Sequence, residues 1–126
     1  MSKEIINTEN APAPIGPYNQ ATKANNFLFI SGQIPADPKS GAIINSSIED
    51  ETHQVMKNLG AILKEAGLGF ENILKTSIFI SNMDDFAKIN AVYGSYFSGD
   101  FPARETVQVA RLPKDVNVEI SAIATF

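Results

Sequence analysis

The C-terminal segment, residues 116–126, alternates apolar and polar side chains, and this alternation constrains the fold more than any other feature of the chain. Successive side chains of a β-strand point to opposite faces of a sheet, so the pattern predicts a strand with one apolar face. That face must be covered by helices, whereas the polar face must meet solvent, a partner subunit or a ligand. The apolar residues are Val116, Val118, Ile120, Ala122 and Ala124, and the polar ones between them are Asn117, Glu119, Ser121 and Thr125.

Runs of β-branched and aromatic residues predict further strands. The turn residues Asn25 and Asn26 separate the first two runs, which therefore suggest a hairpin. The turn over 112–115 suggests a second hairpin at the end of the chain. In the middle strand the residues expected to share one face are Leu74, Thr76, Ile78 and Ile80. The predicted strands span residues 18–24, 27–34, 73–81, 104–109 and 116–126.

Capping residues and apolar periodicity predict two helices. Ser47, followed by an acid three residues later, is typical of a helix N-terminus, and Gly67 is typical of the position after a last helical turn. Asn82 begins a second helix, which Gly99 and Pro102 end. The apolar stripes are Ile48, Val55, Leu59, Ile62, Leu63 and Ala66 in the first helix, and Phe86, Ile89, Tyr93 and Phe97 in the second.

The order of these elements is ββ–α–β–α–ββ, which predicts an α+β fold with one mixed sheet and both helices on one side. The chain of 126 residues is expected to be a single domain over 1–126. The polar face of the sheet then has no cover within the chain. An uncovered face in so small a domain suggests oligomerisation.

Composition excludes several classes of function. The chain has no cysteine and one histidine, so it cannot use thiolates or cysteine-based metal sites, and Ser-His-Asp chemistry would depend on His53 alone. The net charge is −4, without a cluster of basic residues, which argues against nucleic acid as a partner. The sequence shows no metal-ligand spacing and no apolar run long enough to cross a membrane. The N-terminus lacks a secretory signal, so a cytoplasmic protein is expected.

Arg104 and Glu119 are the first candidates for chemistry. The planar fork of an arginine matches a carboxylate, and a glutamate beside it can accept or donate a proton. Together they suit a small α-carboxylate substrate and an activated water. The structural alternative is an ordinary Arg–Glu salt bridge within the sheet. Thr106 shares the face of Arg104 and could help to hold an anion.

Tyr18, Ser31, Gly32 and Asn90 are weaker candidates on their own. Gly32 can permit close approach of a ligand to the backbone, although a bulge or turn is the simpler interpretation. Tyr18 could place its phenol in a pocket or pack half-buried. Asn90 could line a site or brace a helix against a loop.

Several motifs, in the same order along the chain, resemble the RidA/YjgF family. The N-terminal half carries Ala13–Tyr18 and Ser31–Pro35. The C-terminal half carries Phe101–Arg104, Val109–Asp115 and Val118–Ile120, and the segment Phe86–Asn90 with Tyr93 fits as well. The resemblance covers nearly the whole chain.

The resemblance implies a chorismate-mutase-like fold and a homotrimer with clefts between adjacent subunits. It also implies an enamine/imine deaminase without a cofactor, which hydrolyses 2-aminoacrylate through 2-iminopropanoate, and 2-iminobutanoate, to 2-oxo acids and ammonia. By this resemblance Arg104 clamps the substrate carboxylate and Glu119 positions the water. The positions expected in or beside the cleft are Tyr18, Ser31, Gly32, Asn90 and Thr106, the last standing where many members carry cysteine.

Other functions remain open at this point. The same cleft could bind 2-oxo acids in a non-catalytic regulatory protein. Ribonuclease action or translation inhibition is opposed by the charge of the chain. A holdase chaperone would need an exposed apolar patch.

Overall fold

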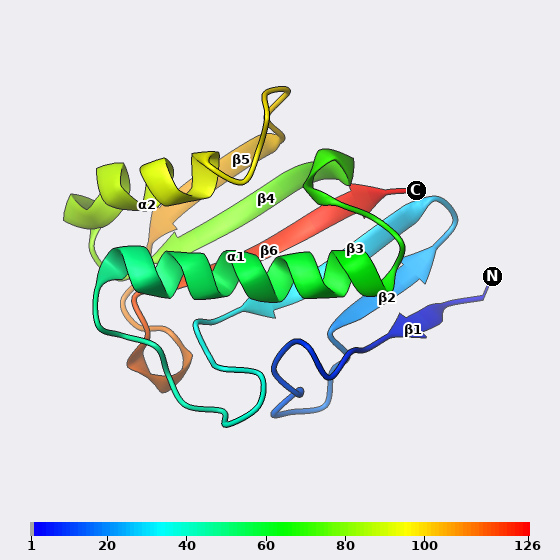
Figure 1. Ribbon diagram of the computed structural model, residues 1–126, viewed down its shortest axis with the longest axis horizontal. Helices are drawn as coiled ribbons and strands as arrows, with labels where there is room; N and C mark the ends of the chain where they lie inside the picture. Colours follow the sequence, from blue (N-terminus) through cyan, green and yellow to red (C-terminus); the bar gives the residue numbers. More distant parts are fainter. Residues whose placement is uncertain (1) are drawn as a thin grey trace.

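The computed structural model describes residues 2–126, which build one mixed six-stranded sheet in the order β1-β2-β3-β6-β4-β5 (Figure 1). All neighbouring strands are antiparallel except β4 and β5, which are parallel. The strands are β1 (Glu4–Ile6), β2 (Ala21–Ala24), β3 (Phe27–Gln33), β4 (Ile73–Ile80), β5 (Ala103–Gln108) and β6 (Val118–Thr125). The predicted single sheet is confirmed.

Two α-helices lie on the same face of the sheet, α1 (Ile48–Glu65) and α2 (Phe86–Gly94), as Figure 1 shows. The Ser47 side chain accepts a hydrogen bond from the amide of Asp50 at the start of α1, as its sequence predicts. Gly67 ends the helix with a φ of +77°, a conformation that glycine adopts without strain. Short 3₁₀ helices cover Phe70–Asn72, Met83–Asp85 and Pro113–Asp115. No helix of the described residues is long and apolar enough to cross a membrane.

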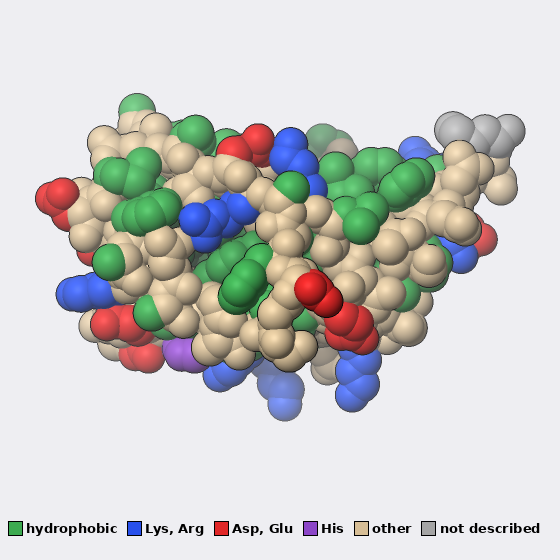
Figure 2. Space-filling view, turned by 90° about the horizontal axis from the view of Figure 1, so that it is seen from above, with side chains coloured by type: hydrophobic (Ala, Val, Ile, Leu, Met, Phe, Trp, Pro, Cys, Tyr) green, Lys and Arg blue, Asp and Glu red, His purple; other side chains and the backbone are tan. Residues whose placement is uncertain are grey.

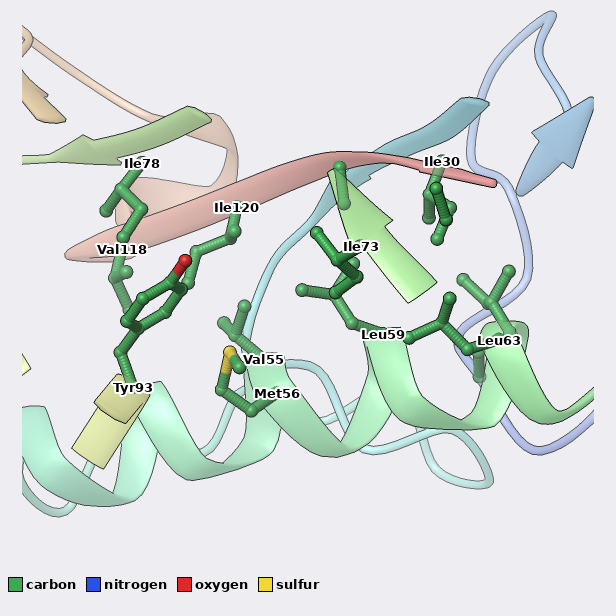
Figure 3. Close-up of a cluster of buried hydrophobic side chains, with 14 of the residues drawn as sticks. Ile30, Val55, Met56, Leu59, Leu63, Ile73, Ile78, Tyr93, Val118 and Ile120 are labelled. Carbon is green, nitrogen blue, oxygen red and sulfur yellow. The ribbon is translucent and has the colours of Figure 1, made fainter. Parts of the chain in front are cut away.

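The hydrophobic core fills the space between α1 and the central strands. Figure 3 shows Val55, Met56, Leu59 and Leu63 rising from α1 towards the apolar side chains of the sheet. The alternation of β6 places Val118, Ile120, Ala122 and Ala124 in this core, as the sequence predicts. The core therefore fixes which face of β6 is open, and with it the face that carries Glu119.

Three sequence predictions about the strands differ from the structure, and the second helix ends at Gly94, before the predicted stop at Gly99 and Pro102, so that Phe97 lies outside it. The strand β1, which pairs with β2, was not predicted because its three residues are too short for a pattern. The final hairpin is wrong: β6 lies between β3 and β4, and β5 pairs with β4. A strand–helix–strand unit, here β4-α2-β5, favours parallel pairing, because the helix returns the chain to the starting edge.

The third difference concerns Leu74, which is exposed and not on the face of Thr76. The pairing of β4 with β6 shifts by one residue between Ile73 and Lys75, so Ile73 takes the buried place. A bulge of this kind reverses the facing of the residues before it.

The face of the sheet away from the helices is less polar than the β6 pattern indicates. Phe27 and Phe29 on β3 and Val107 on β5 each leave about two-fifths of their surface exposed, at 43%, 45% and 42%. They stand in register with Thr125, Ile123 and Phe79 on neighbouring strands. An uncovered face with this many apolar side chains is typical of an interaction surface.

Candidate functional site

Arg104 lies near the start of β5 and points to the side of the sheet that carries the helices. Its Nη1 donates a hydrogen bond of 2.7 Å to Oδ1 of Asn90 on α2. Its guanidinium carbon lies 5.3 Å from the ring centroid of Tyr93 and 5.5 Å from that of Phe86. Cation–π contacts and one hydrogen bond thus orient the guanidinium while its other N–H groups stay free for a ligand.

The sequence predicted Tyr93 and Phe86 only as core residues, and their contact with Arg104 was missed. Phe86, Asn90 and Tyr93 recur at a spacing of four and three residues, which places them on one side of α2. That spacing was the signal that could have linked all three to one cation. Tyr93 is anchored in turn, because its hydroxyl lies 2.8 Å from Oγ1 of Thr76 in the core. Burial raises the pKa of the Tyr93 phenol, so it stays a neutral platform.

Arg104 has no carboxylate partner among residues 2–126. The ion pairs of the described chain are Lys75–Glu105 and Arg111–Asp115. The ordinary Arg–Glu salt bridge, which was the structural alternative for Arg104 and Glu119, is therefore not formed within this chain. A cation that is positioned but not neutralised is suited to an anionic ligand.

Thr106 follows two residues after Arg104 and shares its face, as the sequence predicts. It stands in register with the buried Ile78 on β4, whereas Arg104 stands beside the buried Thr76. The Thr106 hydroxyl oxygen is buried and has no hydrogen-bond partner in the described part of the chain. A buried hydroxyl without a partner is rare, and here it places an unused hydrogen-bonding group beside Arg104.

Glu119 lies on β6 and points to the open face of the sheet. It stands opposite Phe79 on β4, three residues further along than the Thr76 that flanks Arg104. Residues an odd number apart on a strand point to opposite faces, so Arg104 and Glu119 lie on opposite sides of the sheet with β4 between them. One chain therefore places both on the same sheet, as expected, but does not bring them together.

Gly32 supports the carboxylate of Glu119. A Cβ atom at Gly32 would lie 2.6 Å from Oε2 of Glu119, so only glycine leaves room for the carboxylate in this position. Gly32 and Ser31 form a β-bulge, where the pairing of β3 with β6 shifts between Ile30 and Gln33. Partial burial raises the pKa of the Glu119 carboxyl group above its ordinary range. The bulge thus creates a sheltered place for a carboxylate that can take up a proton.

Tyr18 lies near the end of the irregular segment 7–20, here called the N-terminal arm, whereas Ser31 directly precedes Gly32 on β3. The Ser31 hydroxyl donates to the carbonyl of Asn19 at 2.7 Å, and the Ser31 amide donates to the carbonyl of Gln20 at 2.9 Å. Tyr18 and Gly32 line a common cavity, and the Tyr18 side chain is 45% exposed. The sequence-predicted residues therefore fall into two groups, with Asn90, Arg104 and Thr106 in one and Tyr18, Ser31, Gly32 and Glu119 in the other.

The buried Gln20 holds the arm that carries Tyr18. Its Nε2 donates to the carbonyls of Thr8, Ala11 and Pro12 at 3.0, 3.2 and 2.8 Å, and its Oε1 accepts from the Thr8 amide. These bonds fix the path of a proline-rich segment that has no secondary structure of its own. In the described residues, no group of three or more acidic, histidine or cysteine side chains could hold a metal ion.

Comparison with protein families gives a match over residues 8–126 to the family model described as Endoribonuclease L-PSP. A RutC family protein of Pyrococcus horikoshii is 57% identical over 122 residues, which is 97% of each chain. The human 2-iminobutanoate/2-iminopropanoate deaminase is 43% identical over 124 residues, covering 98% of this chain and 90% of the human one.

Solved structures agree with this match over nearly the whole chain. The YjgF gene product of E. coli is 46% identical, with a TM-score of 0.93 over 97% of this chain and 98% of the other. The E. coli protein TdcF, solved with bound serine, is 44% identical, with a TM-score of 0.94 over 98% of each chain.

Proposed function

Because this chain belongs to the RidA/YjgF family, which the Endoribonuclease L-PSP model describes, we propose that it is an enamine/imine deaminase. It hydrolyses 2-iminopropanoate, the imine tautomer of 2-aminoacrylate, and 2-iminobutanoate to the 2-oxo acids and ammonia. One observation carries the proposal: Arg104 is oriented without a carboxylate partner among the described residues, and Glu119 is held as a partly buried carboxylate over Gly32.

The site is completed between two subunits. Arg104 and Glu119 lie on opposite faces of the sheet, so no movement of side chains within one chain can bring them to one substrate. In a second copy, Arg104 lies on β5, at the edge of the sheet and on the side of the helices. If this edge packs against the open face of the first copy, Arg104 of one subunit meets Glu119 of the other. Each cleft then contains Arg104, Asn90 and Thr106 from one subunit and the Glu119, Gly32, Ser31 and Tyr18 group from the next.

A homotrimer is the assembly that we propose for this joining. A head-to-tail contact between two different surfaces closes into a ring, and every subunit in the ring then contributes to two clefts. The exposed Phe27, Phe29 and Val107 on the open face supply the apolar contact surface that such an interface requires. The assembly therefore buries the apolar face and completes the site in one step.

Arg104 binds the substrate carboxylate with two parallel hydrogen bonds, and Asn90 holds the guanidinium in the required plane. The Thr106 backbone and its unpartnered hydroxyl lie beside Arg104 and supply further donors to the same anion. This grip fixes the C2 carbon relative to the facing subunit. Fixing substrate and water together removes much of the entropic barrier to their reaction.

Glu119 acts as the proton carrier. Its carboxylate accepts a proton from water as the water oxygen bonds to C2, and the C=N double bond becomes a single bond. Glu119 then gives that proton to the nitrogen, which completes a carbinolamine. The hydroxyl proton of the carbinolamine passes through Glu119 to the amino group, the C–N bond breaks as the C=O bond forms, and ammonia leaves. The raised pKa brings the carboxyl group closer to the working pH, where one group can serve as base and then as acid.

Ribonuclease activity is not part of this proposal, despite the description of the family model. The chain carries a net charge of −4, which repels a phosphate backbone. On the face seen in Figure 2, Lys and Arg side chains stand singly among Asp and Glu side chains and do not form a continuous basic surface.

The test is direct measurement of imine hydrolysis. Enzymatic oxidation of alanine generates 2-iminopropanoate, and semicarbazide traps the imine that survives. The wild-type protein should lower the trapped product, and Arg104→Ala should not. If a folded wild-type trimer leaves the imine untouched, the deaminase proposal is wrong, and titration with 2-oxo acids would test the non-catalytic binding alternative.

A further inference from the structure

A cavity of about 290 Å³ opens beside Gly32 and Tyr18, and most of its lining lies outside the residues assigned to the reaction above. Its walls are partly apolar, with Pro12, Ile34 and Pro38 among them. Two lysines, Lys39 and Lys114, also line it, although they are far apart in the sequence. The cavity begins at Gly32, the residue that Glu119 packs against, and it combines apolar walls with cations. Such a cavity is suited to the part of a substrate that lies away from the reacting carbon.

The cavity is preformed, because hydrogen bonds fix the loop that forms its outer wall. The buried Asn58 of α1 donates from Nδ2 to the carbonyls of Ile34 and Ala36, at 3.1 and 3.0 Å. Within the loop, Oδ1 of Asp37 accepts from the amides of Lys39 and Ser40 at 2.9 and 2.8 Å. A wall held in this way can select a ligand without first paying the cost of ordering itself.

The charges that line the cavity are not balanced. The lining residues include two lysines but one carboxylate, Asp37, whose Oδ1 already accepts hydrogen bonds from the backbone amides of Lys39 and Ser40. Lys114 forms no ion pair among residues 2–126, and its neighbour Asp115 is already paired with Arg111 at 2.6 Å. Neither Lys39 nor Lys114 is paired with a carboxylate among the described residues, so the cavity has positive charge available for an anion.

The backbone at Lys114 is strained. Lys114 and Asp115 are adjacent non-glycine residues with φ of +55° and +57°, in the left-handed region that such residues seldom occupy. Strained backbone positions of this kind persist only where contacts with the surrounding structure hold them in place, and they are concentrated at binding sites. The strained turn is what presents Lys114 to the cavity.

We propose that this cavity receives the distal carboxylate of 2-imino dicarboxylic acids, such as 2-iminoglutarate, and that Lys114 binds that carboxylate. The inference rests on the proposed function, since it extends the same cleft. With the α-carboxylate on Arg104 and C2 facing Glu119 of the partner subunit, the rest of the substrate passes Gly32 into the cavity. Lys114 is thus a specificity residue for substrates with a second acidic group.

The experiment compares kcat/KM for 2-iminoglutarate and 2-iminopropanoate, each generated by enzymatic oxidation of the amino acid and trapped with semicarbazide. Lys114→Gln should lower the ratio of the two values about 10- to 100-fold, the worth of a hydrogen bond to a charged group. Lys114→Arg should retain most of the ratio. Lys64→Gln, on the exposed last turn of α1, is the matched control and should leave the ratio unchanged.

The failures of the two proposals can be told apart. If the wild type hydrolyses 2-iminopropanoate but not 2-iminoglutarate, or if Lys114→Gln leaves the ratio unchanged, the cavity inference is wrong and the deaminase proposal stands. If neither imine is hydrolysed, calorimetric titration with 2-oxoglutarate and 2-oxobutanoate decides the matter. Tighter binding of 2-oxoglutarate that Lys114→Gln abolishes supports the cavity inference alone, and equal binding overturns it.

Discussion

At the scale of single residues, the site depends on groups whose neighbours keep them available. Arg104 contacts an amide and two aromatic rings, none of which neutralises its charge. Glu119 lies over the bare backbone of Gly32. The sequence could predict Arg104 and Glu119 as candidates, because their chemistry is plain from residue type. It could not predict which neighbours they have, because those neighbours come from distant segments.

Replacing Arg104 by lysine tests the clamp. Lysine keeps the charge but cannot form two parallel hydrogen bonds or lie flat over Tyr93 and Phe86. We expect Arg104→Lys to lower kcat/KM for 2-iminopropanoate about 10- to 100-fold, the worth of a charge-assisted hydrogen bond. The melting temperature should change little, because the Arg104 side chain is exposed in the chain. Near-normal turnover by this variant would show that the clamp is not required.

Glu119→Gln removes the proton carrier while keeping the shape of the side chain. We expect kcat/KM to fall about 10²- to 10⁴-fold, the usual contribution of a positioned acid–base group. In the wild type the acid limb of the pH–kcat/KM profile should lie above the ordinary range of a glutamate, because burial raises the pKa of this carboxyl group. A limb at or below that range would contradict the assignment of Glu119.

The same raised pKa predicts the sign of a stability effect. A carboxyl group with a higher pKa in the folded state than in the unfolded state favours folding when protonated, and this contribution is lost as the pH rises through the folded-state pKa. Glutamine mimics the protonated form at every pH. The melting temperature of Glu119→Gln relative to wild type should therefore rise from acidic to mildly alkaline pH, and a constant difference across a pH series would exclude this explanation.

At the scale of elements, the sequence predicts features that are set within a few residues, such as the ends of α1. It does not predict which strands pair, because pairing depends on distant segments. Ser47 and Gly67 mark the ends of α1 through hydrogen bonds and backbone angles set within a few residues, so the sequence predicts the helix well. The pairing of β5 depends on where α2 returns the chain, which a turn at 112–115 cannot reveal. The predicted hairpin was wrong for this reason.

The bulge at Ser31 and Gly32 shows the same limit. The sequence predicts a bulge or turn at Gly32, but the reason for glycine lies on β6, in the Glu119 carboxylate that a Cβ atom would displace. Likewise, the two candidate groups could be named from the sequence, but their separation by β4 required the observed register.

Gly32→Ala tests the element that positions Glu119. The added Cβ would meet the far end of a flexible side chain, so the carboxylate can move away and the fold should be kept. We expect the free energy of unfolding to change by less than about 1 kcal/mol, since alanine also restricts the unfolded chain. Displacement of Glu119 should lower kcat about 100-fold, as misplacement of a catalytic group commonly does. A variant that is stable and fully active would show that Gly32 does not position Glu119.

At the scale of the whole molecule, the open face of the sheet links folding to function. Its apolar side chains, including Phe27, Phe29 and Val107, contribute nothing to the core of their own chain. Arg104 and Glu119, on opposite faces, form no common site in a monomer. Head-to-tail assembly of the chain would explain both the exposed apolar face and the separation of Arg104 from Glu119.

A charge on the open face should prevent this assembly. Phe29→Glu should leave the circular dichroism of the chain unchanged, because the side chain is exposed, and should shift the mass measured by light scattering from trimer to monomer. Imine hydrolysis should disappear with the trimer. A monomeric variant that keeps full activity would show that one chain is sufficient for catalysis.

The most direct test of the shared site is to mix two inactive chains. Arg104→Ala and Glu119→Gln, carrying different tags, are co-expressed, and the mixed oligomers are purified and assayed for hydrolysis of 2-iminopropanoate. In a closed ring each mixed trimer holds one cleft with both groups intact, so mixed trimers should recover about one third of the wild-type activity. Mixed oligomers as inactive as either parent would show that Arg104 and Glu119 do not act in one site between subunits.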